Sequence, residues 1–209
     1  MSKKEKSFCV NSESDISRAM PSILAALSAG GCILLPTETV YGLAAACHSV
    51  TGIRKILALK ERPKEKSLPV FVRSVEQAKE LAIVNKDAET LMQKFWPGPL
   101  TIVLKARADL PDVLKSSDGF VGLRCPNHAV PLRILREFGH PLCCTSANHS
   151  GQPPVRSIEE ARELFIDDER LSLRLVQIAT CEAAPSTVVK IDKQTLQILR
   201  QGAIQLTKL

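Results

Sequence analysis

Short apolar runs alternate along this chain with stretches whose apolar residues recur at helical spacing, and this alternation limits the fold more than any other feature. Runs with the composition of buried strands cover residues 32–36, 68–72, 100–104, 120–124 and 142–145. Helical patterns cover residues 14–27, 51–60, 75–83, 87–95, 130–138 and 157–165. Two or three strands are expected near 173–179, 186–191 and 195–200. Interleaved helices and strands predict an α/β (α+β) fold, and closing strands without intervening helices predict a mixed sheet.

The length and composition favour one compact domain. The chain has 209 residues, 44% of them hydrophobic, which is enough apolar material for a sizeable core. Residues 1–13 are polar and predict an N-terminal tail, so we expect the domain to cover residues 14–205. No apolar run approaches the roughly 18 residues that span a bilayer, and the first residues lack the apolar core of a signal peptide. We therefore expect a cytoplasmic protein with no membrane partner.

The cysteines predict packing rather than chemistry. There are seven of them, an odd number, and none forms a Cys-x-x-Cys pair. This spacing favours reduced, buried thiols over disulfides or zinc ligands.

Two expected strands end in loops rich in small polar residues. These are the segments 36–42, with sequence Pro-Thr-Glu-Thr-Val-Tyr-Gly, and 145–151, with sequence Thr-Ser-Ala-Asn-His-Ser-Gly. Ligands of open α/β sheets bind beyond the carboxyl ends of strands, so both loops are candidate sites. The alternative for either loop alone is that its polar residues only cap helices or form turns.

Positive charge gathers in a third segment. The net charge of the chain is +6, and residues 54–66 carry six cations and two acids. Within this segment Pro63 ends the helix after Lys60 and Arg62, so these two cations can converge on one phosphate-bearing ligand. The alternative is a solvated helix face. Arg124 and Arg200 each close an expected strand and can project into a crevice, or they can lie on the surface.

Together these segments resemble the YrdC/TsaC family in order and spacing. The matching motifs are PTETVYGL at 36–43, Lys60-x-Arg62-Pro63, FWPGPLT at 95–101, VGLRCP at 121–126, TSANxSG at 145–151, PSTVV at 185–189 and LRxG at 199–202. The resemblance covers about residues 14–205, and seven motifs in the right order are highly specific.

The resemblance implies a twisted mixed sheet with flanking helices, the YrdC-like fold, around a deep positive cleft. It implies a threonylcarbamoyl-AMP synthase, a nucleotidyltransferase that joins L-threonine, bicarbonate and ATP and releases diphosphate. Mg²⁺ would bind through the ATP phosphates, without a metal site of the protein. Partner proteins of the threonylcarbamoyl transferase complex would then modify adenosine 37 of tRNAs that read codons starting with A.

The resemblance also implies roles for particular residues. Catalytic residues are expected at Lys60, Arg62, Ser146 and Asn148. ATP contacts are expected at Arg62, Lys66, Ser146 and Arg200. Contacts to L-threonine are expected at Thr39, Arg124, Ser186 and Thr187.

Three positions depart from the family pattern. Phe71 stands where relatives often carry His, Pro154 where Ser is common, and Lys190 where Asp is usual. These departures bear on the details of threonine and nucleotide binding, whereas the four catalytic positions are intact.

Two other functions are compatible with the charge of the chain. An RNA-binding or ribosome-associated module could use the same basic cleft, although no aromatic residues interleave with the basic run to stack on bases. A relative with this fold could instead have a lost or altered activity. The intact residues at the catalytic positions argue against the second alternative.

Overall fold

The computed structural model describes residues 7–61, 67–165, 168–177, 184–193 and 195–206. Its helices are α1 (Glu13–Ser28), α2 (Val50–Leu59), α3 (Val75–Leu81), α4 (Lys86–Phe95), the 3-10 helix η1 (Asp112–Leu114), α5 (Ala129–Phe138) and α6 (Ile158–Phe165). Its strands are β1 (Ser7–Cys9), β2 (Cys32–Leu35), β3 (Gly42–Ala46), β4 (Val70–Phe71), β5 (Leu100–Lys105), β6 (Phe120–Arg124), β7 (Leu142–Ser146), β8 (Leu171–Val176), β9 (Thr187–Asp192) and β10 (Thr195–Arg200).

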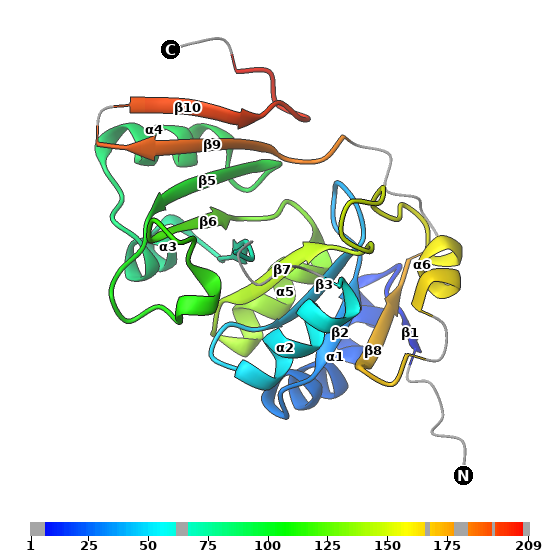
Figure 1. The fold of residues 1–209 in the computed structure, drawn as a ribbon. Helices are drawn as coiled ribbons and strands as arrows, with labels where there is room; N and C mark the ends of the chain where they lie inside the picture. The colour runs from blue at the N-terminus through cyan, green and yellow to red at the C-terminus, as the bar shows by residue number, and fades with distance from the viewer. Residues whose placement is uncertain (1–6, 62–66, 166–167, 178–183, 194, 207–209) are drawn as a thin grey trace.

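Within the described ranges the strands form one mixed sheet. Its order is β1-β8-β2-β3-β7-β4-β6-β5-β9-β10. The sheet contains parallel pairs, such as β2 with β8 and β5 with β9, and antiparallel pairs, such as β2 with β3 and β9 with β10. Figure 1 shows β9 and β10 at the end of the molecule opposite β8 and β1. The expected mixed sheet with flanking helices is confirmed.

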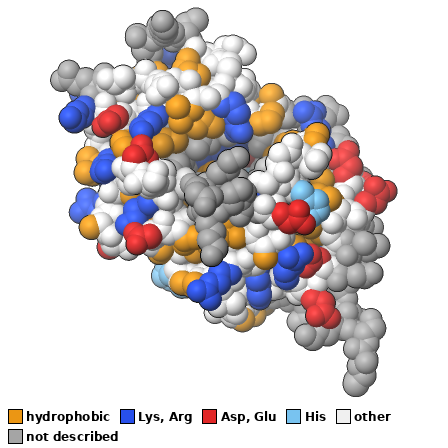
Figure 2. Space-filling view, viewed as in Figure 1, with side chains coloured by type: hydrophobic (Ala, Val, Ile, Leu, Met, Phe, Trp, Pro, Cys, Tyr) orange, Lys and Arg blue, Asp and Glu red, His pale blue; other side chains and the backbone are white. Residues whose placement is uncertain are grey.

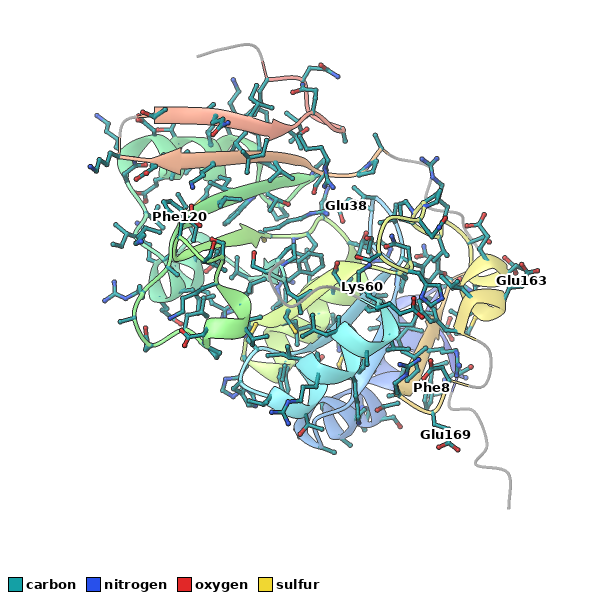
Figure 3. The ribbon with its side chains drawn as sticks, in the orientation of Figure 1. Phe8, Glu38, Lys60, Phe120, Glu163 and Glu169 are labelled. Carbon is teal, nitrogen blue, oxygen red and sulfur yellow. The ribbon has the colours of Figure 1, made fainter. Side chains whose placement is uncertain are left out.

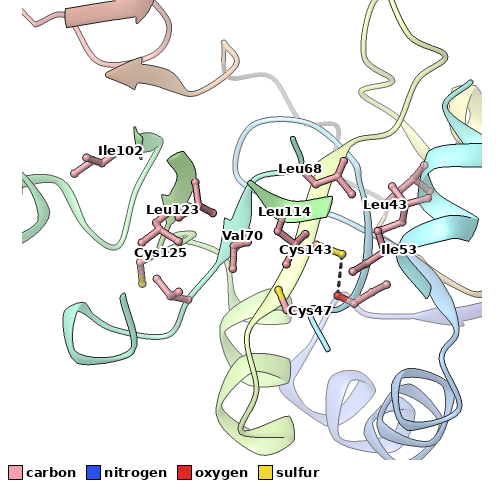
Figure 4. Packing of buried hydrophobic residues seen from close by; sticks show 14 of the residues in the cluster. Leu43, Cys47, Ile53, Leu68, Val70, Ile102, Leu114, Leu123, Cys125 and Cys143 are labelled. Carbon is pink, nitrogen blue, oxygen red and sulfur yellow. Dashed lines mark hydrogen bonds between the residues drawn. The ribbon is translucent and has the colours of Figure 1, made fainter. Parts of the chain in front are cut away.

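Helices cover both faces of the central strands because these strands are apolar on both sides. In β2, Ile33 and Leu35 pack with Ile23 of α1 and Ile134 of α5. The alternating residue Leu34 belongs to a second cluster, which includes α2. Figure 4 shows part of this second cluster, where the Cys143 thiol donates a hydrogen bond to the Ala45 carbonyl. A strand buried on both faces reads as a continuous apolar run, as in CILL of β2.

Three elements differ from the sequence-based expectations. Ser7–Cys9 lie in the segment expected to be a tail, yet they pair with β8 as a parallel edge strand. The β3 strand, GLAAA, follows the 36–42 loop and is buried at every position. Helix α1 begins at Glu13, where Ser12 is the N-cap residue of a capping box, and it continues through Pro21.

Helix α2 approaches the sheet closely at Gly52. A Cβ atom at this position would lie 2.8 Å from the Ala45 Cβ and 3.2 Å from the Gly31 carbonyl oxygen. Glycine thus allows the contact that places the carboxyl end of α2 beside the β7 loop.

We predict that Gly52→Ala destabilises the protein. Alanine favours helix by about 1 kcal/mol, but overpacking a tight contact costs typically 1–3 kcal/mol. Chemical denaturation should therefore give a lower free energy of unfolding. Thr51→Ala, at an exposed position of the same turn, is the control and should change it by less than about 0.5 kcal/mol. A Gly52→Ala protein as stable as the control would contradict the close approach.

Candidate functional site

A cavity of about 320 Å³ opens between the loops that follow β2 and β7 and the segments around β9 and β10. Figure 2 shows a hollow near the middle of the face turned to the viewer. Its lining includes the site residues Thr39, Arg124, Ser146, Asn148, Ser186 and Arg200 expected from the sequence. The structure therefore gathers six expected residues, from segments far apart in the chain, around one space.

The loop after β2 is shaped by one hydroxyl group. The Thr37 Oγ1 accepts hydrogen bonds from the Thr39 and Val40 backbone N–H groups, at 3.1 and 3.2 Å, and donates to the Val40 carbonyl at 2.6 Å. Such side-chain bonds to the local backbone fix a turn. This turn presents the Thr39 hydroxyl to Arg124, whose Nη2 donates to it at 3.2 Å.

Arg124, at the end of β6, is buried, with 6% of its surface exposed. Its Nε donates to the Gly98 carbonyl at 3.2 Å, and its guanidinium carbon lies 5.6 Å from the centre of the Phe71 ring. A buried arginine needs partners for its donors, and these contacts supply them. The side chain is fixed against the cavity wall as a group that can receive a carboxylate or phosphate oxygen.

Arg200, at the end of β10, forms a second cationic wall. Its Nε and Nη2 donate to the Ser186 carbonyl at 3.0 and 2.8 Å, and Nη2 also reaches the Ser186 hydroxyl at 3.1 Å. That hydroxyl lies 3.0 Å from Thr101 Oγ1. Loss of hydration on partial burial lowers the pKa of Arg200, and the positive charge of Arg124 lowers it further. Two arginines around one cavity favour an anionic ligand.

Lys60 lies beside the cavity rather than in its lining, and its side chain serves the Ser146–Asn148 loop. Its ammonium group donates to the Ser146 carbonyl at 2.6 Å, to the Asn148 carbonyl at 2.9 Å and to Asn148 Oδ1 at 2.7 Å. The residue is 1% exposed. The ammonium group of Lys60 thus has three protein acceptors. The expected convergence of Lys60 and Arg62 on one ligand stays a prediction. Arg62 and Lys66 lie outside the described residues.

The loop held by Lys60 is also cross-linked internally. Asn148 Oδ1 accepts from the Ser146 hydroxyl at 2.6 Å, and Asn148 Nδ2 donates to the carbonyls of His149 and Gln152 at 2.9 and 2.6 Å. The Asn148 amide thus shapes the loop. Ser146 can donate to a ligand only if its hydroxyl turns away from Asn148.

Thr187 lies outside the cavity lining. It is fully buried, and its hydroxyl donates to the Ile204 carbonyl at 2.7 Å and accepts from the N–H groups of Gly202 and Ile204, both at 3.0 Å. Its side chain anchors the segment after β10 and leaves Ser186 as the neighbouring hydroxyl in the cavity.

Sequence reasoning missed several lining residues, among them Thr37, Tyr41, Thr101 and Gln152. The motifs at 36–43 and 95–101 contain three of them, Thr37, Tyr41 and Thr101. Their place in motifs next to strand ends is the sequence feature that could have identified them as lining residues. Two of the three departures, Phe71 and Pro154, also line the cavity. The third, Lys190, is absent from the lining; it pairs with Asp118 at 2.6 Å, and its ammonium group lies 3.8 Å from the centre of the Phe120 ring.

Five cysteines are buried free thiols, as predicted: Cys32, Cys47, Cys125, Cys143 and Cys144. Cys9 is exposed, and Cys181 lies outside the described residues. Cys144 reaches the cavity wall, but burial raises the pKa of its thiol far above the ordinary value. Burial likewise raises the pKa of Cys125 to about 11. Thiols of this kind stay protonated near neutral pH and are weak nucleophiles.

The described part of the chain contains no cluster of three or more His, Cys, Asp or Glu side chains that could hold a metal ion. The cavity offers hydroxyl, amide and guanidinium groups, whereas Mg²⁺ prefers carboxylate and phosphate oxygens. These residues fit a magnesium ion that arrives on a phosphate ligand. Over the described residues, no helix is long and apolar enough to cross a membrane.

Comparisons with known proteins point in one direction. The model of the Sua5/YciO/YrdC family, described as telomere recombination, matches residues 25–202. A Methanocaldococcus jannaschii protein provisionally named threonylcarbamoyl-AMP synthase is 33% identical over 184 residues, 86% of this chain and 84% of the relative. The threonylcarbamoyl-AMP synthase of Yersinia enterocolitica is 36% identical over 151 residues, 70% of this chain and 79% of the relative.

A solved structure is similar over nearly the whole chain. The crystal structure of Pyrococcus abyssi Sua5 complexed with L-threonine superposes with a TM-score of 0.84 and 29% identity. The match covers 96% of this chain and 58% of the Pyrococcus chain. This chain therefore spans little more than half the length of that relative.

We predict that Lys60→Met destabilises the protein. Methionine fills a similar volume but removes the ammonium donor from the Ser146 carbonyl, the Asn148 carbonyl and Asn148 Oδ1, at a cost on the order of 3 kcal/mol. Thermal denaturation should show a clear drop in Tm. Lys79→Met, which removes the exposed ion pair with Glu89, is the control and should cost at most about 1 kcal/mol. Equal effects of both substitutions would contradict the role of Lys60 in holding the loop.

Proposed function

The chain belongs to the Sua5/YciO/YrdC family, and from that premise we propose that it is a threonylcarbamoyl-AMP synthase acting on L-threonine, bicarbonate and ATP. The observation that carries the proposal is that two arginines, the buried Arg124 and the exposed Arg200, line one cavity together with several hydroxyl groups. The named activity of the relatives and the L-threonine bound to the Pyrococcus protein support it.

The reaction brings together groups that carry negative charge. The amine of L-threonine attacks bicarbonate to give a carbamate and water. A carbamate oxygen then attacks the α-phosphorus of ATP, and diphosphate leaves. Such a nucleotidyl transfer needs charge neutralisation and alignment of the reactants, and no covalent nucleophile of the protein.

Arg124 and Thr39 are the proposed contacts for the carboxylate of L-threonine. Arg124 is a planar cation fixed by Gly98 and Phe71, and the Thr39 hydroxyl lies within hydrogen-bond distance of it. A fixed guanidinium binds a carboxylate with little loss of side-chain entropy. Ser186, bonded to Arg200, supplies a further hydroxyl close to this end of the cavity.

The nucleotide phosphates are assigned to the remaining groups. Arg200 and Ser146 line the cavity and are proposed as ATP contacts, together with Arg62 and Lys66 from the resemblance. In this proposal Lys60 and Asn148 act by shaping the Ser146–Asn148 loop. Mg²⁺ supplies charge neutralisation on the phosphates when bound with ATP.

The product, L-threonylcarbamoyl-AMP, would pass to a transferase complex that modifies tRNA, as the sequence resemblance implies. The RNA-binding alternative is less favoured. On the face shown in Figure 2, Lys and Arg side chains of the described residues are interspersed with Asp and Glu. Arg124 is buried in the cavity wall, whereas backbone binding to RNA uses exposed cations.

We predict that the protein forms a threonine-dependent adenylate. Incubation with ATP labelled at the α-phosphate, Mg²⁺, bicarbonate and L-threonine should release diphosphate and give a new AMP-containing product. Omitting L-threonine is the control. Absence of product, or equal product without L-threonine, would refute the proposed function.

We predict that Arg124→Gln raises the KM for L-threonine by about 10- to 100-fold, because a hydrogen bond to a charged group contributes about 1.5–3 kcal/mol. The KM for ATP should change much less. Arg133→Gln, at an arginine paired with Glu13 and Glu137 on the surface, is the matched control. Equal changes in both KM values would show that Arg124 does not contact the amino acid.

A further inference from the structure

Glu38 lies directly behind Arg124 and outside the cavity lining. Its Oε1 is 2.8 Å from Arg124 Nη2 and accepts a hydrogen bond from the Asn127 backbone N–H, also at 2.8 Å. The Glu38 and Arg124 side chains are 18% and 7% exposed. Figure 3 shows Glu38 near the middle of the molecule, on the loop between β2 and β3. An ion pair this close to the cavity acts on whatever Arg124 binds.

Arg124 is fixed on several sides, and one of its nitrogens remains for a ligand. Nε donates to the Gly98 carbonyl, and Nη2 donates to Glu38 and to the Thr39 hydroxyl. The Phe71 ring lies close to the guanidinium. Among the described residues nothing accepts a hydrogen bond from Nη1. Since Arg124 lines the cavity, Nη1 is the nitrogen that can meet an incoming carboxylate oxygen.

The negative charge of Glu38 offsets the electrostatic repulsion between Arg124 and Arg200. Arg200 faces the same cavity, and the charge of Arg124 contributes to the lowered pKa of Arg200. Together with the hydrogen bonds to Gly98 and Thr39, the Glu38 carboxylate holds the Arg124 guanidinium in place against this repulsion. Glu38 is itself held by the Asn127 N–H, just before α5, where the helix dipole favours an anion.

We propose that Glu38 is a positioning residue for the amino-acid substrate, and this rests on the proposed function. Glu38 holds the guanidinium of Arg124 so that Nη1 points at the carboxylate of L-threonine. Acting through Arg124, Glu38 sets the affinity for the amino acid and leaves the affinity for ATP unchanged.

The test is Glu38→Gln in the full chain. Glutamine keeps the shape and an acceptor oxygen but loses the charge. The KM for L-threonine should rise about tenfold, as expected for loss of a charged hydrogen-bond partner, while the KM for ATP stays within about twofold. Binding of L-threoninamide, which lacks the carboxylate, should also stay within about twofold, which general damage to the site would not allow. Glu13→Gln, in the exposed pair with Arg133, is the matched control and should change none of these values.

The outcomes separate the two proposals. A wild-type protein that forms no threonine-dependent adenylate refutes the proposed function before any variant is measured. With an active wild type, an unchanged or lowered KM for L-threonine in Glu38→Gln overturns the positioning role. So does an equal weakening for L-threonine and L-threoninamide. If Glu38→Gln does not fold, Glu38→Asp carries the test, because its carboxylate is one methylene farther from Arg124. The same selective rise supports the proposal, and an unchanged KM overturns it.

Discussion

The burial of cationic side chains is the constraint that organises this structure. Lys60, Arg124 and Arg174 are each less than 7% exposed, and each donates to main-chain carbonyls: Ser146 and Asn148, Gly98, and Phe165. A buried charge without acceptors costs several kcal/mol, so the loops that supply these carbonyls are tied to the positions of the cations. Beside the cavity, Lys60 holds the Ser146–Asn148 loop and Arg124 holds the turn at Gly98, and Arg124 also contributes positive charge to the cavity itself.

The class of the fold was predictable because strand-like and helix-like runs alternate clearly in the sequence. The β3 strand was harder, since its sequence GLAAA has the composition of a helix and becomes a strand only between β2 and β7. Ser7–Cys9 form a strand only because β8 offers a free edge. In both cases pairing with distant strands decides the conformation, and no local pattern contains that information.

The candidate site was predictable where a polar residue closes a strand. Arg124, Ser146 and Arg200 stand at such ends, and the structure places all three around one cavity. The direction of a long side chain was not predictable in this way. The Lys60 ammonium donates hydrogen bonds to residues 86 and 88 positions away in the chain, and the Thr187 hydroxyl bonds to the segment after β10 instead of lining the cavity. Local spacing cannot reveal partners that only the folded chain brings close.

The hairpin of β9 and β10 also imposes an order on the making of the site. Ser186 and Arg200, which form one cavity wall, are translated after every other lining residue, and they join the sheet through β5. A nascent chain that has emerged only as far as β8 contains every described strand except β9 and β10, but its cavity has no second arginine. The capacity to bind a multiply charged ligand is therefore acquired late in synthesis.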